Sequence, residues 1–205
     1  MLKRRSVTTL LAVVGALVAV PPLARPARAQ RGEHAVVFVK DTADQLVAIA
    51  NSAAPPTEKR RRLQQVIDAT VDADEIARYC LGRFGHLATP EQQRDYLTLF
   101  NELLITSIAG HLGEYQGVRI TMGLARAVED TDVVVTMVER PNNPTYQVDW
   151  VVSIATGGPK IIDLLAGGTS LRLTQGSDFA AYLARHQYSI HELIEGMRLL
   201  VAQSG

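Results

Sequence analysis

Residues 117–165, GVRITMGLARAVEDTDVVVTMVERPNNPTYQVDWVVSIATGGPKIIDLL, decide the fold of this chain. Four runs rich in valine and isoleucine, at 118–128, 133–140, 145–155 and 160–165, are typical of β-strands. The segments between them read EDT, PNNP and TGGP, and such residues favour tight turns. Because short turns join neighbouring strands in opposite directions, the stretch predicts a four-stranded antiparallel meander.

Alternation along the second and third strands predicts one apolar face and one mixed face for the sheet. Within each of these strands the larger apolar side chains share a face: Val133, Val135 and Met137 in one, and Val148, Trp150 and Val152 in the other. Asp149 alternates to the face opposite Trp150, so we expect its carboxylate to be exposed to solvent. A sheet of this kind is covered by helices on one side only.

Apolar residues at helical spacing lie on both sides of the strands. Before them we expect a helix over 34–50, others capped by Thr57 and Asp72, and a long one that Thr89 caps and that runs to about residue 115. After them we expect two helices, over 177–186 and from Ser189 onward. Helices, then a meander, then helices specify an α+β domain with segregated layers.

The first 29 residues have the features of an export signal. A basic start, KRR at 3–5, precedes an uncharged run over 7–20, and ARA at 27–29 is the small-x-small pattern that a signal peptidase cleaves. We predict cleavage after Ala29, which leaves residues 30–205 as one mature domain. The alternatives are an uncleaved N-terminal anchor and, for the export route, a twin-arginine signal.

Composition then narrows the class of protein. The whole chain has 205 residues, 47% of them hydrophobic, with 21 basic and 21 acidic side chains. Cleavage would remove five basic residues and no acidic ones, leaving 16 against 21 and a net charge near −5. An acidic exported domain argues against a nucleic-acid binder. No later stretch is long and apolar enough to span a membrane, so we expect a soluble mature chain.

Residues that could support catalysis are few. The five histidines show no zinc-binding spacing, and nothing in the sequence activates the single cysteine, Cys80, as a nucleophile. An enzyme built on this fold would use Asp149 or Asp163 for proton transfer together with Tyr146. A small polar inventory beside a large apolar one favours binding over catalysis, with no metal and no cofactor.

Three segments together resemble a known family. They are DADEIARYCLG (72–82) followed by ATPEQQ (88–93), the strand region 117–154, and PKIIDLLAGGTSLRLTQGSDF (159–179) followed by ELI (192–194). Their order and spacing over about residues 34–200 resemble the MlaC family, also called the toluene-tolerance auxiliary family. A tryptophan usual in that family before the Lys-Ile-x-Asp strand is Pro159 here.

The resemblance implies a nuclear-transport-factor-like α+β cone with a small helical subdomain, and acyl chains held between the sheet and the helices. It implies a periplasmic phospholipid shuttle that helps to maintain outer-membrane lipid asymmetry. Its partners would be an inner-membrane ABC transporter bearing an MCE-domain protein and an outer-membrane lipoprotein complex. The alternatives are a carrier of the family's hopanoid-associated branch, the proton-transfer enzyme and a purely structural interaction protein.

The residues expected to line the lipid slot follow from the same resemblance. Nine apolar side chains form this set: Phe100, Leu103, Leu104, Val133, Val135, Met137, Val148, Trp150 and Val152. The six from the strands are expected on one wall and the three from the long helix opposite them. Phospholipid would be the cargo, and each methylene moved out of water would contribute about 0.8 kcal/mol to binding.

Overall fold

The computed structural model describes residues 27–154 and 157–203, so residues 1–26 of the expected export signal lie outside the described residues. The helices are α1 (Ala27–Asn51), α2 (Pro56–Thr70), α3 (Ala73–Leu81), α4 (Pro90–His111), α5 (Leu171–Arg185) and α6 (Ile190–Gln203). Two short 3-10 helices, η1 (Gly82–Leu87) and η2 (Leu112–Tyr115), flank α4. The strands are β1 (Arg119–Val128), β2 (Thr131–Glu139), β3 (Tyr146–Ser153), β4 (Lys160–Ala166) and β5 (Thr169–Ser170).

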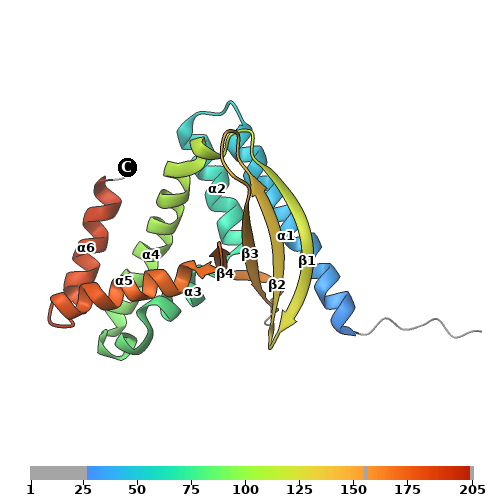
Figure 1. The fold of residues 1–205 in the computed structure, drawn as a ribbon. Coiled ribbons are helices and arrows are strands. Elements are labelled where there is room, and N and C mark those ends of the chain that lie inside the picture. Colours follow the sequence, from blue (N-terminus) through green and yellow to red (C-terminus); the bar gives the residue numbers. More distant parts are fainter. Residues whose placement is uncertain (1–26, 155–156, 204–205) are drawn as a thin grey trace, which may run out of the picture.

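The strands form one antiparallel sheet in the order β1-β2-β3-β4-β5, with helices before and after it in the chain (Figure 1). The predicted α+β fold and its meander are confirmed, and the two-residue strand β5 is the one addition. β5 turns back on β4 through Gly167 and Gly168, whose φ angles of 55° and 82° are accessible to glycine at little cost.

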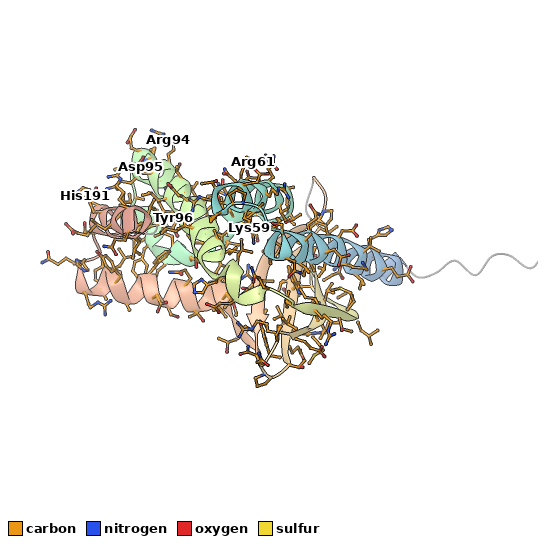
Figure 2. All side chains as sticks on the ribbon, turned by 90° about the horizontal axis from the view of Figure 1, so that it is seen from above. Lys59, Arg61, Arg94, Asp95, Tyr96 and His191 are labelled. Carbon is orange, nitrogen blue, oxygen red and sulfur yellow. The ribbon has the colours of Figure 1, made fainter. Side chains whose placement is uncertain are left out.

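One face of the sheet, here called the inner face, packs against α1. The sheet core lies between them and consists of Ala35, Val39, Ala43, Val134, Trp150, Val152 and Ile161. Its members from α1 recur at four-residue intervals, which places them on one side of the helix. Seen from above in Figure 2, α1 and α2 lie on the same side of the sheet.

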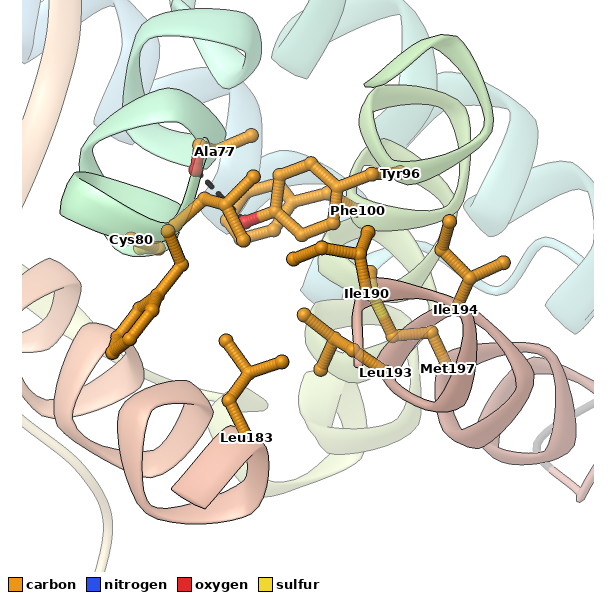
Figure 3. Close-up of a cluster of buried hydrophobic side chains, with 11 residues drawn as sticks. Ala77, Cys80, Tyr96, Phe100, Leu183, Ile190, Leu193, Ile194 and Met197 are labelled. Carbon is orange, nitrogen blue, oxygen red and sulfur yellow. Dashed lines mark hydrogen bonds between the residues drawn. The ribbon is translucent and has the colours of Figure 1, made fainter. Parts of the chain in front are cut away.

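A second core lies in the helices away from the sheet and involves α3, α4, α5 and α6. This helical core consists of Ala77, Cys80, Leu81, Phe84, Tyr96, Phe100, Leu183, Ile190, Leu193, Ile194 and Met197 (Figure 3). Inside it the Tyr96 hydroxyl donates a 2.8 Å hydrogen bond to the Ala77 carbonyl. That bond satisfies the polar end of a side chain that is otherwise surrounded by apolar atoms.

A third core, the junction core, connects the sheet to the helical core. It consists of Ile49, Ala50, Leu63, Val66, Ile67, Ile105 and Leu112, from α1, α2, α4 and η2. The sheet is also tied to α2, because the Lys160 ammonium at the start of β4 donates to the carbonyls of Asp68 and Ala69. A cation at these last carbonyls of α2 satisfies groups that the helix leaves open.

Two predicted helix caps are present, but the predicted cap at Thr57 is wrong, because α2 begins at Pro56 after Pro55 with no side-chain cap. Two helices start earlier than expected: α1 begins at Ala27, before the predicted residue 34, and α5 is the other. Asp72 accepts from the backbone N–H of Glu75, and Thr89 forms the predicted capping box with Gln92. The start of α5 was predicted at residue 177, but the helix begins at Leu171. Ser170 caps it by accepting from the N–H of Leu173. The Asp163 carboxylate of β4 accepts from the N–H of Arg172 at the same helix start, as described below.

Candidate functional site

The pairing register divides the predicted wall of strand residues between the two faces of the sheet. Directly opposite residues share a face, and Val134 pairs with Trp150 while Val135 pairs with Asp149. Val148, Trp150 and Val152 therefore lie on the inner face. Val133, Val135 and Met137 lie on the other face, so the prediction that all six line one wall is wrong. Alternation assigns faces within a strand, but only the register matches the faces of two strands.

The three residues expected on the opposite wall are divided as well. Phe100 is a member of the helical core, where its ring lies 6.1 Å from that of Tyr96, and Leu103 packs against the same core. Leu104 packs against the junction core instead. Leu103 and Leu104 are thus neighbours in α4 that face different cores, because α4 lies between the helical core and the junction core.

What remains of the predicted set defines a seam between the inner face and the helices. Val148, Trp150 and Val152 border it from the sheet, and Leu104 borders the junction core on the other side. Leu46 packs against both cores. The side chains that border the seam are apolar.

One buried hydrogen-bond chain crosses the sheet side of the seam. The Trp150 indole N–H donates to the Thr136 hydroxyl at 3.0 Å, and that hydroxyl donates to the Val148 carbonyl at 2.9 Å. Thr136 is fully buried. All polar atoms of this chain are therefore occupied, and the surface presented to the seam is apolar.

A polar cluster lies where the inner face ends, at the β2–β3 turn. The Arg140 guanidinium lies over the rings of Tyr115 and Tyr146, at 5.2 and 5.6 Å from their centroids. Its Nη1 contacts the carboxylate of Glu114 at 3.3 Å. Burial and hydrogen bonding to Tyr115 raise the pKa of Tyr146 to about 12, so its phenol stays protonated at neutral pH.

Sequence reasoning missed Tyr115 and Arg140 and considered Tyr146 only as a proton-transfer group. A weak signal existed, since Arg140 and Tyr146 continue the alternation of inner-face residues at the ends of their strands. No pattern in the sequence places η2 beside them, because that contact joins distant parts of the chain.

Two hollows of similar size open on the described surface, and the first lies beside the seam, because its lining includes Ile67 of the junction core and Val71, which packs against both cores. One of about 280 Å³ lies between α2, α3 and α4 and is lined by residues such as Asp68, Asp72 and Asn101. The other, of about 290 Å³, lies between α3 and α5. Both volumes lie just below the range for drug-sized ligands, roughly 300–1,000 Å³.

The acids considered for proton transfer do not meet Tyr146. Asp149 lies on the face opposite Trp150, as predicted, but the expected exposure is wrong. Its carboxylate is 7% exposed and accepts a hydrogen bond from Gln147, with the Arg126 guanidinium 3.9 Å away. Tyr146 shares the inner face with Trp150, so the sheet itself separates the two groups.

Asp163 has a structural role at the start of α5. It accepts from its neighbour's N–H, from the Ser170 hydroxyl and from the backbone N–H of Arg172, and its carboxylate lies 3.5 Å from the Arg172 guanidinium. A carboxylate at a helix N-terminus satisfies N–H groups that have no partner in the helix. This interaction explains why α5 begins at Leu171.

The other polar groups considered among the described residues form no second candidate site. Within residues 27–154 and 157–203, no group of three or more His, Cys, Asp or Glu residues is placed to hold a metal ion. Two basic side chains of α2 that Figure 2 labels are engaged locally: Arg61 pairs with Glu58, and the Lys59 ammonium donates to the Ala50 carbonyl. No helix of the described part of the chain is long and apolar enough to cross a membrane.

The fold and the seam define a class, an α+β protein whose sheet and helices enclose an apolar layer with a polar rim. The family model of the MlaC protein matches residues 40–199, and the chain belongs to the MlaC family. This confirms the family expected from the sequence.

Two known proteins show how far the likeness extends. The toluene tolerance protein Ttg2D of Pseudomonas putida is 25% identical over 144 residues, which cover 69% of this chain and 67% of that protein. A phospholipid-binding protein of Ralstonia solanacearum, solved in complex with a phospholipid, superimposes with a TM-score of 0.71 at 25% identity. The match covers 82% of this chain and 97% of the solved one.

Proposed function

We propose that this protein is a periplasmic phospholipid carrier that binds its cargo in the seam and breaks no bond. The observation that carries the proposal is the match along most of both chains to a protein solved with a phospholipid bound. The apolar layer between the inner face and the junction core supports it. The acyl chains would lie there, each buried methylene contributing about 0.8 kcal/mol, while the headgroup stayed near solvent.

In this proposal, loading separates the two layers. The seam is bordered by half-buried side chains, Val148 from β3 and Leu104 from α4, that belong to different cores. Separation at such a boundary leaves each core largely intact, whereas a cavity opened inside one core would disrupt its packing. The free energy of opening would be offset by the apolar area of the lipid that is buried.

A pair of valines offers a sharp test of the site. Val148 and Val135 are both half-buried and lie on opposite faces of the sheet. We expect native mass spectrometry after exchange with phospholipid vesicles to show bound phospholipid on the wild type and on Val135→Phe. Val148→Phe should carry much less lipid, because its ring fills the seam. Thermal unfolding of both variants checks that each still folds.

Two outcomes would contradict the proposal. A wild type that carries no lipid would exclude the carrier function, and equal loss of lipid in both variants would exclude the seam. The identity of the bound lipid also separates the phospholipid carrier from a carrier of the hopanoid-associated branch, since a hopanoid has a different mass and no phosphate.

Export and transport partners are part of the same proposal. The expected partners are an inner-membrane ABC transporter with an MCE-domain protein and an outer-membrane lipoprotein complex, and the expected role is the maintenance of outer-membrane lipid asymmetry. Crosslinking in intact cells tests this. Recovery of an MCE-domain component with the carrier is expected, and its consistent absence would contradict the transport role.

A further inference from the structure

The polar cluster at the end of the inner face has one group that the protein leaves without a partner. The Nε–H of Arg140 is buried and has no hydrogen-bond partner among the described residues. Side-chain exposure of Arg140 is 22%, so water reaches part of the guanidinium but not this atom. A buried donor without an acceptor is costly, and such groups in native proteins call for an explanation.

The free edge of this guanidinium has a definite shape. Glu114 contacts Nη1, on the far side of the fork from Nε. The rings of Tyr115 and Tyr146 lie against the guanidinium, which restricts its orientation. The Nε–H has no partner among the described residues, so the Nε and Nη2 edge is the one that a ligand would meet once the seam opens. Two parallel N–H groups at this spacing match two oxygens of a carboxylate or of a phosphate.

The position of the cluster at the end of the apolar inner face favours the phosphate of a lipid over a carboxylate. Val138 and Tyr146 are paired across β2 and β3, so Tyr146 and Arg140 continue the inner face directly beyond its apolar part. Tyr115 packs against the junction core from the other side of the seam. Figure 1 shows that the β2–β3 turn and the C-terminal end of α4 lie at the same end of the molecule.

We propose that Arg140, with Tyr115 and Tyr146, binds the anionic phosphoryl group of the lipid headgroup at the mouth of the seam. This inference rests on the proposed carrier function and adds the chemistry that selects the cargo. Arg140 supplies the two-donor edge, and Tyr146, whose hydroxyl is hydrogen-bonded to Tyr115, leaves the Tyr115 hydroxyl to donate to a further oxygen.

The charge of Glu114 is compatible with this role. Its side chain is 58% exposed, so water screens its repulsion of a phosphate. Its contact with Nη1 leaves Nε on the other side of the guanidinium. The cluster therefore has one carboxylate that positions the guanidinium and a separate edge for the ligand.

The test compares a phospholipid with a diacylglycerol of the same acyl chains, which differ only in the headgroup. Loading from vesicles onto the purified chain is measured by native mass spectrometry for the wild type, Arg140→Gln and Arg140→Lys. Arg119→Gln is the matched control, because Arg119 is 82% exposed and pairs with Glu139 at the same end of the sheet. Thermal unfolding shows whether each variant folds.

We expect the wild type and Arg119→Gln to prefer the phospholipid, and Arg140→Gln to lose about tenfold of that preference, as for one charge-assisted interaction. Arg140→Lys keeps the charge but not the fork, so it should recover only part of the preference. An unchanged preference in Arg140→Gln would overturn the headgroup assignment alone. A wild type that loads neither lipid would overturn the carrier function together with it.

A second arm separates a lipid headgroup from free phosphate. Inorganic phosphate is titrated into the lipid-free wild type and Arg140→Gln, with thermal unfolding as the readout. We expect little stabilisation of either form at millimolar phosphate, because the acyl chains supply most of the affinity. Stabilisation that depends on Arg140, without any effect of Arg140→Gln on lipid preference, would make this a phosphate site and overturn the proposal.

Discussion

The indole N–H of Trp150 donates a 3.0 Å hydrogen bond to the hydroxyl of Thr136 on the neighbouring strand, inside the sheet core. The two side chains come from positions 14 residues apart and lie on the same face. The bond places the one tryptophan of the chain at the border of the seam with no free donor. Trp150 is therefore packed in the sheet core and has its indole N–H hydrogen-bonded as well.

Thr136→Val should destabilise the protein by about 1–3 kcal/mol, because valine keeps the shape but leaves the indole donor unsatisfied in an apolar core. Urea denaturation followed by the fluorescence of Trp150 measures the change. Thr121→Val on β1 is the control, since Thr121 is exposed. Equal effects of the two substitutions would show that the hydrogen bond contributes nothing.

Arg31→Ala should destabilise the fold by about 1–3 kcal/mol, since it leaves a buried carboxylate without its cation. Asp132 is fully buried, its Oδ2 accepts from the Arg31 Nε at 3.0 Å, and its Oδ1 has no partner among the described residues. Adding Asp132→Asn should restore part of the loss, because it removes the uncompensated charge. Urea denaturation of the single and double variants checks both statements.

The exposed Lys40–Asp44 pair gives the matched control for that experiment. Lys40→Ala should leave the denaturation midpoint nearly unchanged, because an exposed ion pair is screened by water. If Arg31→Ala has no larger effect than Lys40→Ala, the buried carboxylate does not depend on Arg31.

The exported protein should begin at Gln30, which is measurable as the intact mass of protein isolated from the periplasm. Cleavage after Ala29 falls within the first turn of α1 and retains Arg31, so the mature chain keeps the ion pair with Asp132. A mass that includes residues 1–29 would support the uncleaved anchor. A start beyond Arg31 would predict the lower stability of Arg31→Ala.

Cys80 should react slowly with iodoacetamide in the folded protein and rapidly after denaturation. Burial, with a smaller contribution from the Asp163 charge, raises the pKa of its thiol to about 11 from 9.0, so the reactive thiolate is scarce near neutral pH. The thiol also donates to the Arg172 carbonyl at 3.4 Å. The labelling rate, followed by mass spectrometry, should rise about tenfold per pH unit from 8 to 10.

The raised pKa of Cys80 also makes the free energy of unfolding depend on pH. Because the folded state favours the protonated thiol, the contribution of Cys80 is fully present below pH 9 and is lost as the pH rises through about 11. Cys80→Ala should remove this part of the alkaline destabilisation. Equal labelling of folded and unfolded protein would show that the thiol is accessible.

Much of the fold was predictable because it depends on local signals. Valine-rich runs separated by turn residues predicted the meander, and the cap at Thr89 predicted the start of α4. The start of α5 was not predictable in this way. It depends on the contact between Asp163 and the N–H of Arg172, which are nine residues apart and meet only once β4 and β5 have paired.

The candidate site was less predictable than the fold. The faces of β2 and β3 were each assigned correctly, but the wrong face of β2 was combined with the inner face of β3. Asp149 shows the same limit, since its face was predicted and its burial was not. Burial depends on neighbours such as Gln147 and Arg126, and Arg126 comes from a strand that the chain reaches much earlier.

The sequence by itself determined the elements, their order, the caps at Asp72 and Thr89 and the family, because each of these follows from residues close together in the chain or from their spacing. The tertiary structure decided which side chains meet. Side chains alternate with a period of two, so a strand has two possible faces toward the helices, and the pairing of Val134 with Trp150 selects one. That one choice places Arg140 and Tyr146 beside Tyr115 where the inner face ends.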